Sequence, residues 1–157
     1  MASTFHICRS SLLAAAADNV WQHAITMRGV NRELWPLARM SYPAEAATLS
    51  LTADQLGRPL FRSTIFLCGV LPVDYDRITI VEFERPRRFL ERSTMLSQST
   101  WQHERVVEPH GAGCRITDRV EATPRVGLLA PLHRAAFTAA FALRHRNLRK
   151  MFGELDE

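Results

Sequence analysis

The stretch between residues 60 and 123 constrains the fold most, because it reads as consecutive β-strands joined by short connections. We predict strands at residues 60–70, 77–84, 88–97, 100–108 and 113–123. Short connections favour antiparallel hairpins, since a parallel crossover needs a dozen or more residues. The middle of the chain is therefore expected to form an antiparallel sheet.

Ahead of this stretch, the sequence predicts a strand, two short helices and another short strand. The expected ranges are 4–9 for the first strand, from Ser10 or Ser11 to about Met27 for the first helix, Arg32 to Trp35 for the second, and 38–42 for the strand. A serine is a favoured helix N-cap, and Gly29 should break the first helix. Asn31 is expected to cap the second helix, which Pro36 ends.

A long helix is predicted to close the chain. Pro131 suits the first turn of a helix that runs to about Phe152, where Gly153 provides a C-cap signal. The order is then one strand, two helices, about six strands and one helix. Helices segregated to one face of an antiparallel sheet make an α+β fold, and 157 residues fit a single domain over residues 1–157.

Composition and cysteine content narrow the class of protein. Cys8, Cys68 and Cys114 are far apart and form no C-x-x-C pair, so neither a disulfide framework nor a cysteine zinc site is expected. No stretch approaches the roughly 18 apolar residues of a transmembrane helix, and no secretory signal is recognised. We expect a cytoplasmic protein without a transmembrane segment.

The net charge of +4 is not taken as evidence for nucleic acid binding. Most basic residues are interleaved with acidic ones, apart from clusters at residues 85–88 and 144–150. The second cluster also suits the negative end of a helix dipole. Nucleic acid is therefore not predicted as a partner.

One face of the last three predicted strands should mix apolar and ionisable side chains. Alternation places these residues together: Phe89, Glu91, Ser93, Met95, Trp101, His103, Arg105, Cys114, Ile116, Asp118 and Val120. The opposite side of strand 113–123 carries Arg115, Thr117, Arg119 and Glu121, and we expect it to face water. Burying an unpaired charge is costly, so the ionisable residues should pair or line a ligand cavity.

A register for these strands can be predicted from the turns. It places His103 opposite Asp118, Trp101 opposite Val120, Arg105 opposite Ile116, Ser93 near His103 and Glu91 near Arg105. Two pairs are expected, His103 with Asp118 and Arg105 with Glu91. They can be structural pairs or contacts for a ligand, and both interpretations remain open.

The final helix should face this sheet with an apolar stripe. Its members are Phe137, Ala140, Phe141, Leu148 and Phe152. Arg144 lies on the same stripe and can meet an acidic ligand group or Asp118, or extend to the surface.

At this point the chain resembles the START-like helix-grip superfamily (SRPBCC), in its polyketide cyclase/dehydrase and lipid-transport branch. The resemblance rests on element order, on the closing helix 141–148, and on four patterns: Val20-Trp21, residues 89–93, residues 101–105, and Asp118-Arg119-Val120 leading to Pro124. It implies a seven-stranded sheet that grips the C-terminal helix around an elongated apolar cavity. Arg105 departs from the pattern, because such proteins often carry a second histidine there.

Three functions are considered. The first is binding of a hydrophobic molecule of lipid, polyketide or aromatic type by Phe89, Glu91, Met95, Trp101, His103, Arg105, Asp118, Val120, Phe137, Phe141 and Arg144. The second is a cyclase, aromatase or dehydrase in which His103 acts as general base, Asp118 orients it and Arg105 stabilises an oxyanion. The third is a protein-interaction module. No cofactor is predicted, and no metal, because Arg105 would repel a cation beside His103.

Overall fold

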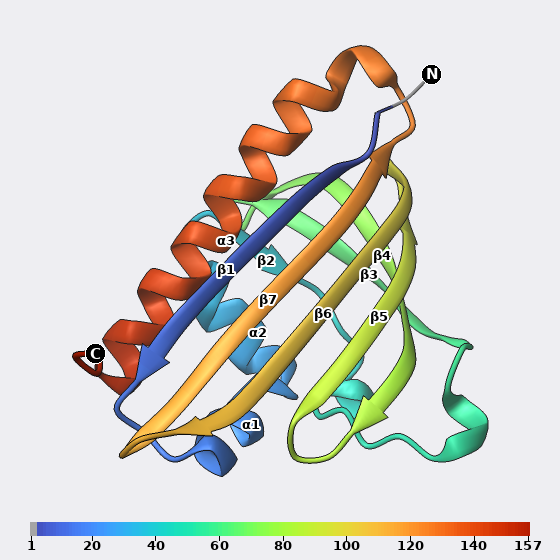
Figure 1. The fold of residues 1–157 in the computed structure, drawn as a ribbon. Helices are drawn as coiled ribbons and strands as arrows, with labels where there is room; N and C mark the ends of the chain where they lie inside the picture. The colour runs from blue at the N-terminus through green and yellow to red at the C-terminus, as the bar shows by residue number, and fades with distance from the viewer. Residues whose placement is uncertain (1–2) are drawn as a thin grey trace.

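A computed structural model describes residues 3–157 as one seven-stranded antiparallel sheet with three helices (Figure 1). The strand order is β1-β7-β6-β5-β4-β3-β2. The strands are β1 (Phe5–Leu13), β2 (Ala38–Met40), β3 (Pro59–Leu67), β4 (Leu71–Glu84), β5 (Arg88–Met95), β6 (Gln98–His110) and β7 (Gly113–Pro124). The helices are α1 (Ala17–Ala24), α2 (Met27–Leu34) and α3 (Ala130–Phe152).

The sheet curls, and the helices gather on its concave side. In Figure 1, β2, β3 and β4 curl behind the front strands, and α1, α2 and α3 lie on that same side. The predicted α+β helix-grip fold is confirmed, with two short helices after the first strand and a long helix at the end.

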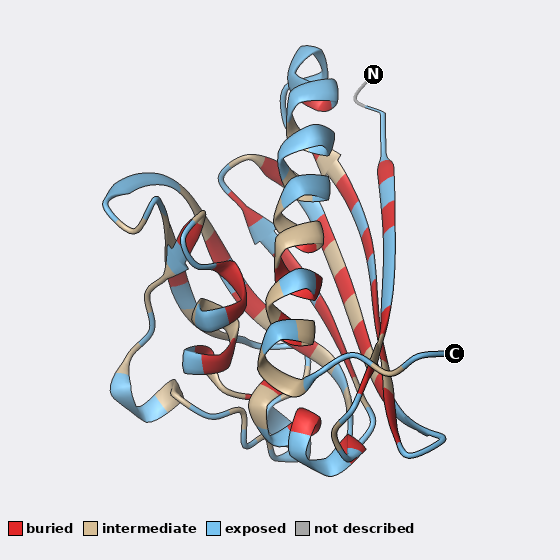
Figure 2. Cartoon of the chain, turned by 90° about the vertical axis from the view of Figure 1, so that its left-hand side faces the viewer, coloured by how far each residue is buried: buried red, intermediate tan, exposed pale blue. Residues whose placement is uncertain are grey.

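The two halves of α3 are held very differently. The helix packs on β1, β7 and α2, and its buried residues after Ala130 all lie between Phe141 and Leu148. Residues 131–140 are exposed or only partly buried, and Figure 2 shows this half largely in pale blue. The sheet therefore grips mainly the C-terminal half of the helix.

The core has two apolar clusters on the concave side. The larger one surrounds Trp21 and includes Ile80, Phe89 and Leu148. The smaller one consists of Phe5, Ile7, Met95, Trp101, Val120, Ala122 and Phe141, with Ile65 and Phe137 against it. The ring of His103 joins the two clusters, because it packs edge-on against Phe89 at 5.7 Å and Phe141 at 5.2 Å between ring centres.

The N-terminal elements differ from the prediction. Ser10 and Ser11 belong to β1, so the first helix begins only at Ala17. Gly29 does not break a helix but lies inside α2, where a Cβ would approach the His23 carbonyl oxygen to 2.2 Å. The α2 helix is capped by Thr26, whose Oγ1 accepts from the Gly29 amide at 3.0 Å, and not by Asn31.

The predicted register is wrong by two residues. Val120 and not Asp118 lies opposite His103, and Asp118 lies opposite Arg105. Between β6 and β7, Trp101 also lies opposite Ala122, and Val107 lies opposite Ile116. Between β5 and β6, Glu91 lies opposite His103, and Ser93 lies opposite Trp101. Strands β6 and β7 stay paired up to a tighter turn than predicted, because His110 pairs with Gly113.

A shift of two residues leaves every side chain on its predicted face, because side chains alternate with a period of two. The predicted mixed face, from Phe89 to Val120, is accordingly buried. One member of the expected water-facing set differs, since Thr117 is buried beneath β1, where its Oγ1 lies 3.1 Å from Ser10 Oγ.

Candidate functional site

Arg105 is the centre of a buried polar network. Its side chain is fully buried and extends from β6 toward Asp118 on the adjacent strand. Nε donates to Asp118 Oδ1 and Nη2 donates to Oδ2, both at 2.8 Å. On its other side, Nη1 and Nη2 donate to Glu33 Oε2 and Oε1 of α2 at 3.0 and 2.8 Å. The planar guanidinium thus forms two-pronged contacts with two carboxylates.

Asp118 also accepts from two histidines. Nε2 of His103 lies 2.7 Å from Oδ1, and Nε2 of His145, on α3, lies 2.8 Å from Oδ2. The other ring nitrogen of His145 is 2.8 Å from Ser11 Oγ, which accepts from Arg149 Nη1 at 3.0 Å. Each oxygen of Asp118 therefore has two hydrogen-bond partners, drawn from β6 and α3.

Glu33 is satisfied in the same way. Arg144 Nε donates to Oε1 at 3.0 Å, and His23 Nε2 lies 2.8 Å from Oε2. Together with the two bonds from Arg105, each oxygen of Glu33 has two partners. The two carboxylates and two guanidiniums also cancel in charge.

Electrostatics keep this network ionised. Burial would raise the pKa of Glu33, but the charges of Arg105 and Arg144 and hydrogen bonds from His23 and Arg105 outweigh it and hold the pKa well below its usual range. Burial would likewise raise the pKa of Asp118, and the charge of Arg105 with its hydrogen bonds lowers it instead. Burial would lower the pKa of Arg105, and the two carboxylates raise it.

The predicted pairs are only partly observed. The contact between His103 and Asp118 is present, whereas Arg105 does not pair with Glu91 and Arg144 does not reach Asp118. Both arginines meet Glu33, which the sequence reasoning missed because it placed that residue in a short second helix with no assigned partner. His23, His145 and Ser11 were also missed. The predicted face gave no signal for a further carboxylate, because its two carboxylates, Glu91 and Asp118, already matched the two guanidiniums of Arg105 and Arg144.

A second polar cluster lies beside the first on the concave face. Asp76 of β4 and Glu91 of β5 are buried, and their side chains share a hydrogen bond. Burial, the charge of Glu91 and this hydrogen bond raise the pKa of Asp76 well above its usual range. Asp76 Oδ1 and Glu91 Oε1 have no hydrogen-bond partner.

Apolar side chains lie on the strands next to this second cluster. Met95 lies opposite Asp76, and Trp101 packs against two residues of α3, with ring centres 4.8 Å from Phe137 and 6.4 Å from Phe141. All of the predicted ligand-binding residues are buried except Phe137, which is partly buried. Their role in ligand binding, and that of His103 and Asp118 in catalysis, stays a prediction.

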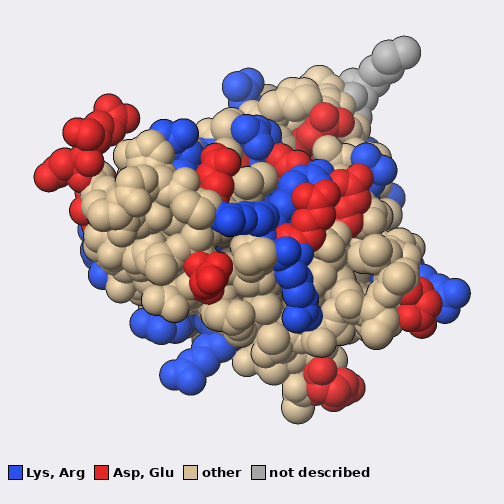
Figure 3. Space-filling view, turned by 60° about the horizontal axis from the view of Figure 1, so that its bottom comes forward, with Lys and Arg blue, Asp and Glu red and all other residues tan. Residues whose placement is uncertain are grey.

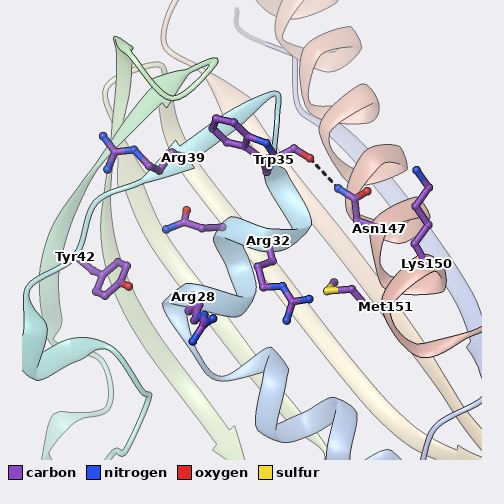
Figure 4. Close-up of a pocket in the computed structure, with 9 residues that line it drawn as sticks. Arg28, Arg32, Trp35, Arg39, Tyr42, Asn147, Lys150 and Met151 are labelled. Carbon is purple, nitrogen blue, oxygen red and sulfur yellow. Dashed lines mark hydrogen bonds between the residues drawn. The ribbon is translucent and has the colours of Figure 1, made fainter.

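Two hollows on the surface lie elsewhere. A groove of about 510 Å³ between α2, β2 and α3 is lined by Arg28, Asn31, Arg32, Trp35, Arg39, Tyr42, Asn147, Lys150 and Met151 (Figure 4). A second hollow of about 780 Å³ lies where the start of β1 meets one side of α3, between Phe5 and Ala139. The residues predicted from the sequence line neither hollow.

Within residues 3–157, no three His, Cys, Asp or Glu side chains are arranged to hold a metal ion. None of the described helices combines the length and the apolar character that crossing a bilayer requires.

Solved structures share this fold at low sequence identity. Protein CV1439 from Chromobacterium violaceum is 12% identical with a TM-score of 0.69, covering 97% of this chain and 98% of its own. A START superfamily protein from Mycobacterium smegmatis is 5% identical with a TM-score of 0.65, covering 94% and 96%. Norcoclaurine synthase from Thalictrum flavum, in complex with dopamine and hydroxybenzaldehyde, is 14% identical with a TM-score of 0.64, covering 96% and 87%.

These likenesses establish the START-like helix-grip fold, as the sequence resemblance implied. No curated protein matches the chain in sequence. One family does match, over residues 11–152, and it is described as a domain of unknown function. Since this match spans most of the chain, the protein belongs to the family Domain of unknown function (DUF8410).

Proposed function

We propose that this protein binds a small, mainly apolar molecule that carries hydrogen-bond donors, between strands β4–β6 and helix α3. One observation supports this most directly. Within residues 3–157, the buried side-chain atoms without a hydrogen-bond partner are Asp76 Oδ1, Glu91 Oε1 and Gln98 Oε1. All three are oxygens, which can accept a hydrogen bond from a ligand.

The three side chains belong to the neighbouring strands β4, β5 and β6. Gln98 reaches α3 directly, because its Nε2 lies 2.9 Å from His133 Nδ1. Glu91 lies opposite His103, whose ring contacts Phe141 of α3. Asp76 joins this group through Glu91. The acceptors thus lie on the side of the sheet that α3 covers.

Leaving these oxygens unpaired is unfavourable, which supports a ligand with matching donors. A buried acceptor without a partner costs about 1–3 kcal/mol. An amine or hydroxyl group could donate to the carboxyl pair, while Met95, Trp101 and Phe137 contact the apolar part of the molecule. Burial of such a surface contributes about 25 cal/mol per Å².

The ligand would enter beneath the N-terminal half of α3. This half is the less buried part of the helix, and the exposed side chains of Leu128 and Leu132 lie at its start. Outward movement of this half would separate Phe137 from Trp101 and expose both rings to a ligand. Arg105, Asp118 and Arg144 would stay in their network and support the site from the gripped end of the helix.

The likeness to norcoclaurine synthase is consistent with this ligand class. That enzyme was solved with dopamine and hydroxybenzaldehyde, which are aromatic molecules with hydroxyl groups, and dopamine also carries an amine. At 14% identity it shares the fold, and the ligand class is brought to this chain only as part of the proposal.

The proposal is tested with two probes that differ at one end. Tyramine and 4-hydroxyphenylacetate share a phenol ring, but one carries an amine and the other a carboxylate. We expect calorimetry to show saturable binding of tyramine with a Kd lower by about tenfold, which corresponds to ~1.4 kcal/mol. The double variant Asp76→Asn with Glu91→Gln should remove this preference.

A matched control keeps the change in charge but moves it away from the site. Glu82→Gln with Glu84→Gln alters two exposed carboxylates on β4 and should leave both affinities unchanged. The proposal is contradicted if neither tyramine nor the smaller probe phenol binds, or if the preference for tyramine survives in the Asp76 and Glu91 variant.

A further inference from the structure

The groove between α2, β2 and α3 concentrates positive charge. Arg28 and Arg32 come from α2, Arg39 from β2 and Lys150 from α3, and no acidic residue lines the groove. Figure 4 shows the two α2 arginines in the middle, with Arg39 on one side and Lys150 on the other. These cations come from three separate elements, so the fold and not a local run of sequence brings them together.

Most of these cations have no partner in the protein. Within the described part of the chain, Arg28, Arg32 and Lys150 form neither an ion pair nor a side-chain hydrogen bond. Arg39 stacks on the Phe66 ring at 4.5 Å and makes only long contacts, of 3.4 and 3.5 Å, to the Gly69 carbonyl. The opposite pattern is found at Arg88 on β5, which contacts three glutamates.

The placement of Arg28 is unfavourable for the folded chain alone. It lies in the first turn of α2, where the helix dipole favours a negative charge and no acidic residue is present. Arg32 follows four residues later on the same side of the helix, and like charges at this spacing repel. An anion between the two guanidiniums would reverse both effects.

Two asparagines fix the walls of the groove. The side chain of Asn31 donates to the Met40 carbonyl at 2.9 Å and accepts from the Met40 amide at 2.7 Å, which ties α2 to β2. Asn147 donates to the carbonyls of Glu33 and Trp35 at 2.8 and 2.9 Å, which ties α3 to the end of α2. The groove is therefore held open before any ligand arrives, and such preorganisation favours binding.

Trp35 adds a flat apolar surface to this charged groove. The ring lies against Gly69, where an added Cβ would approach Cζ3 to 2.9 Å. The side chain is nevertheless 55% exposed, so much of the ring remains open to solvent. Such a surface can stack on the ring of a ligand.

We propose that this groove is a second binding site, which takes a phosphate-bearing ligand whose flat or apolar part packs against Trp35. Arg28 and Arg32 bind the phosphate oxygens, since guanidinium groups match phosphate with paired hydrogen bonds. Lys150 and Arg39 add positive charge from either side. The same phosphate chemistry occurs in soluble nucleotides and in lipid headgroups, and the experiment separates these two sources.

Calorimetry at low ionic strength with inorganic pyrophosphate and with ATP tests the soluble source. Sedimentation with phosphatidylcholine vesicles, with and without phosphatidic acid, tests the lipid source. We expect the double variant Arg28→Glu with Arg32→Glu to raise the Kd of pyrophosphate and ATP about tenfold or more, the effect of one lost charge-assisted hydrogen bond. Trp35→Ala should weaken ATP about tenfold and leave pyrophosphate unchanged.

The control variant Arg58→Glu with Arg87→Glu makes the same change of charge at two exposed residues outside the groove. It should bind every probe as the unaltered protein does. Binding to phosphatidic acid vesicles alone, lost in the Arg28 and Arg32 variant, would assign the site to lipid headgroups. The proposal is overturned if no probe binds, or if the control weakens binding as much as the groove variant.

The two proposed sites can fail independently. The Arg28 and Arg32 variant should bind tyramine as the unaltered protein does, because both arginines are exposed and line only the groove. An intact fold is verified by circular dichroism, and both substituted side chains are exposed.

Discussion

Two buried polar clusters lie on the concave face of the same sheet, and they differ in how completely they are satisfied. In the network around Arg105, each oxygen of Asp118 and Glu33 has two hydrogen-bond partners. In the pair of Asp76 and Glu91, one oxygen of each carboxyl has none. Both clusters contain two carboxyl groups, but only the first is accompanied by two guanidiniums.

This difference is the reason why the proposed ligand contacts are assigned to the second cluster and not to the first. A buried carboxylate matched by cations and donors has nothing left to offer a ligand, even where it contacts a histidine as Asp118 does. A carboxyl pair without cations retains acceptors that no group in the protein satisfies. An ionisable residue on a concave face therefore indicates a ligand contact only if its hydrogen-bonding capacity is not already satisfied within the protein.

The largest expected effect comes from removing the cation of the satisfied cluster. Arg105→Met would leave Asp118 and Glu33 buried with too little positive charge, and we expect the free energy of unfolding to fall by about 3–5 kcal/mol. Urea denaturation at neutral pH, followed by circular dichroism, measures this change. A loss of less than about 1 kcal/mol would mean that the network is not needed for stability.

The opposite sign is expected in the unsatisfied cluster. Asp76→Asn removes a carboxyl that must either hold a proton or bury a second negative charge, so the free energy of unfolding at pH 7 should rise by about 1–3 kcal/mol. The same denaturation experiment applies, with the exposed Glu84→Gln as a control that should change little. A destabilised Asp76→Asn protein would show that both clusters are structural.

The pH dependence should sharpen the contrast. The folded state raises the pKa of Asp76, so the penalty for this residue should disappear as the pH falls from 7 toward about 4, near the pKa of an unfolded aspartate. The advantage of Asp76→Asn over the unaltered protein should shrink over this range. The folded state lowers the pKa of Glu33 and Asp118, so their stabilisation should be lost only below about pH 4. Unfolding at several pH values checks both trends, and an advantage that grows on acidification would contradict this assignment.

The smallest effect is expected at the exposed ion pairs of the outer face. Arg119 contacts Glu104 at 2.9 Å with a side chain that is 60% exposed. Over the centre of the face shown in Figure 3, basic and acidic side chains lie next to one another. Arg119→Met should change the free energy of unfolding by about 0–1 kcal/mol, which provides a reference for Arg105→Met. A loss of more than about 1 kcal/mol in the free energy of unfolding would show that this exposed ion pair contributes more to stability than expected.

The sequence predicted the fold and the composition of the concave face because both depend on simple periods. Alternation placed Glu91, His103, Arg105 and Asp118 together, and an error of two residues in the register did not disturb this. The partners of these residues could not be obtained in the same way, because hydrogen bonds depend on register and on elements far apart in the chain.

Two omissions show where sequence reasoning stops. Glu33 was overlooked because the cap of α2 was assigned to Asn31 instead of Thr26, which left the helix too short to present a buried face. Asp76 was overlooked because the fourth strand was predicted to begin at residue 77, directly after Asp76, whereas β4 begins six residues earlier at Leu71. In both cases a boundary error of a few residues concealed a buried carboxyl group.

Because α3 is buried mainly in its C-terminal half, it can rotate as a rigid body about the buried part, as a lever does. Its fulcrum lies near Phe141, and about 11 residues extend beyond it to Ala130, a length of about 16 Å at 1.5 Å per residue. A tilt of about 10° around this point would displace the Ala130 end by about 3 Å, which is close to the thickness of an aromatic ring. The side chains between Phe141 and Leu148 would hardly move. Access to the concave face would then require rotation of a rigid rod and not the unfolding of any element.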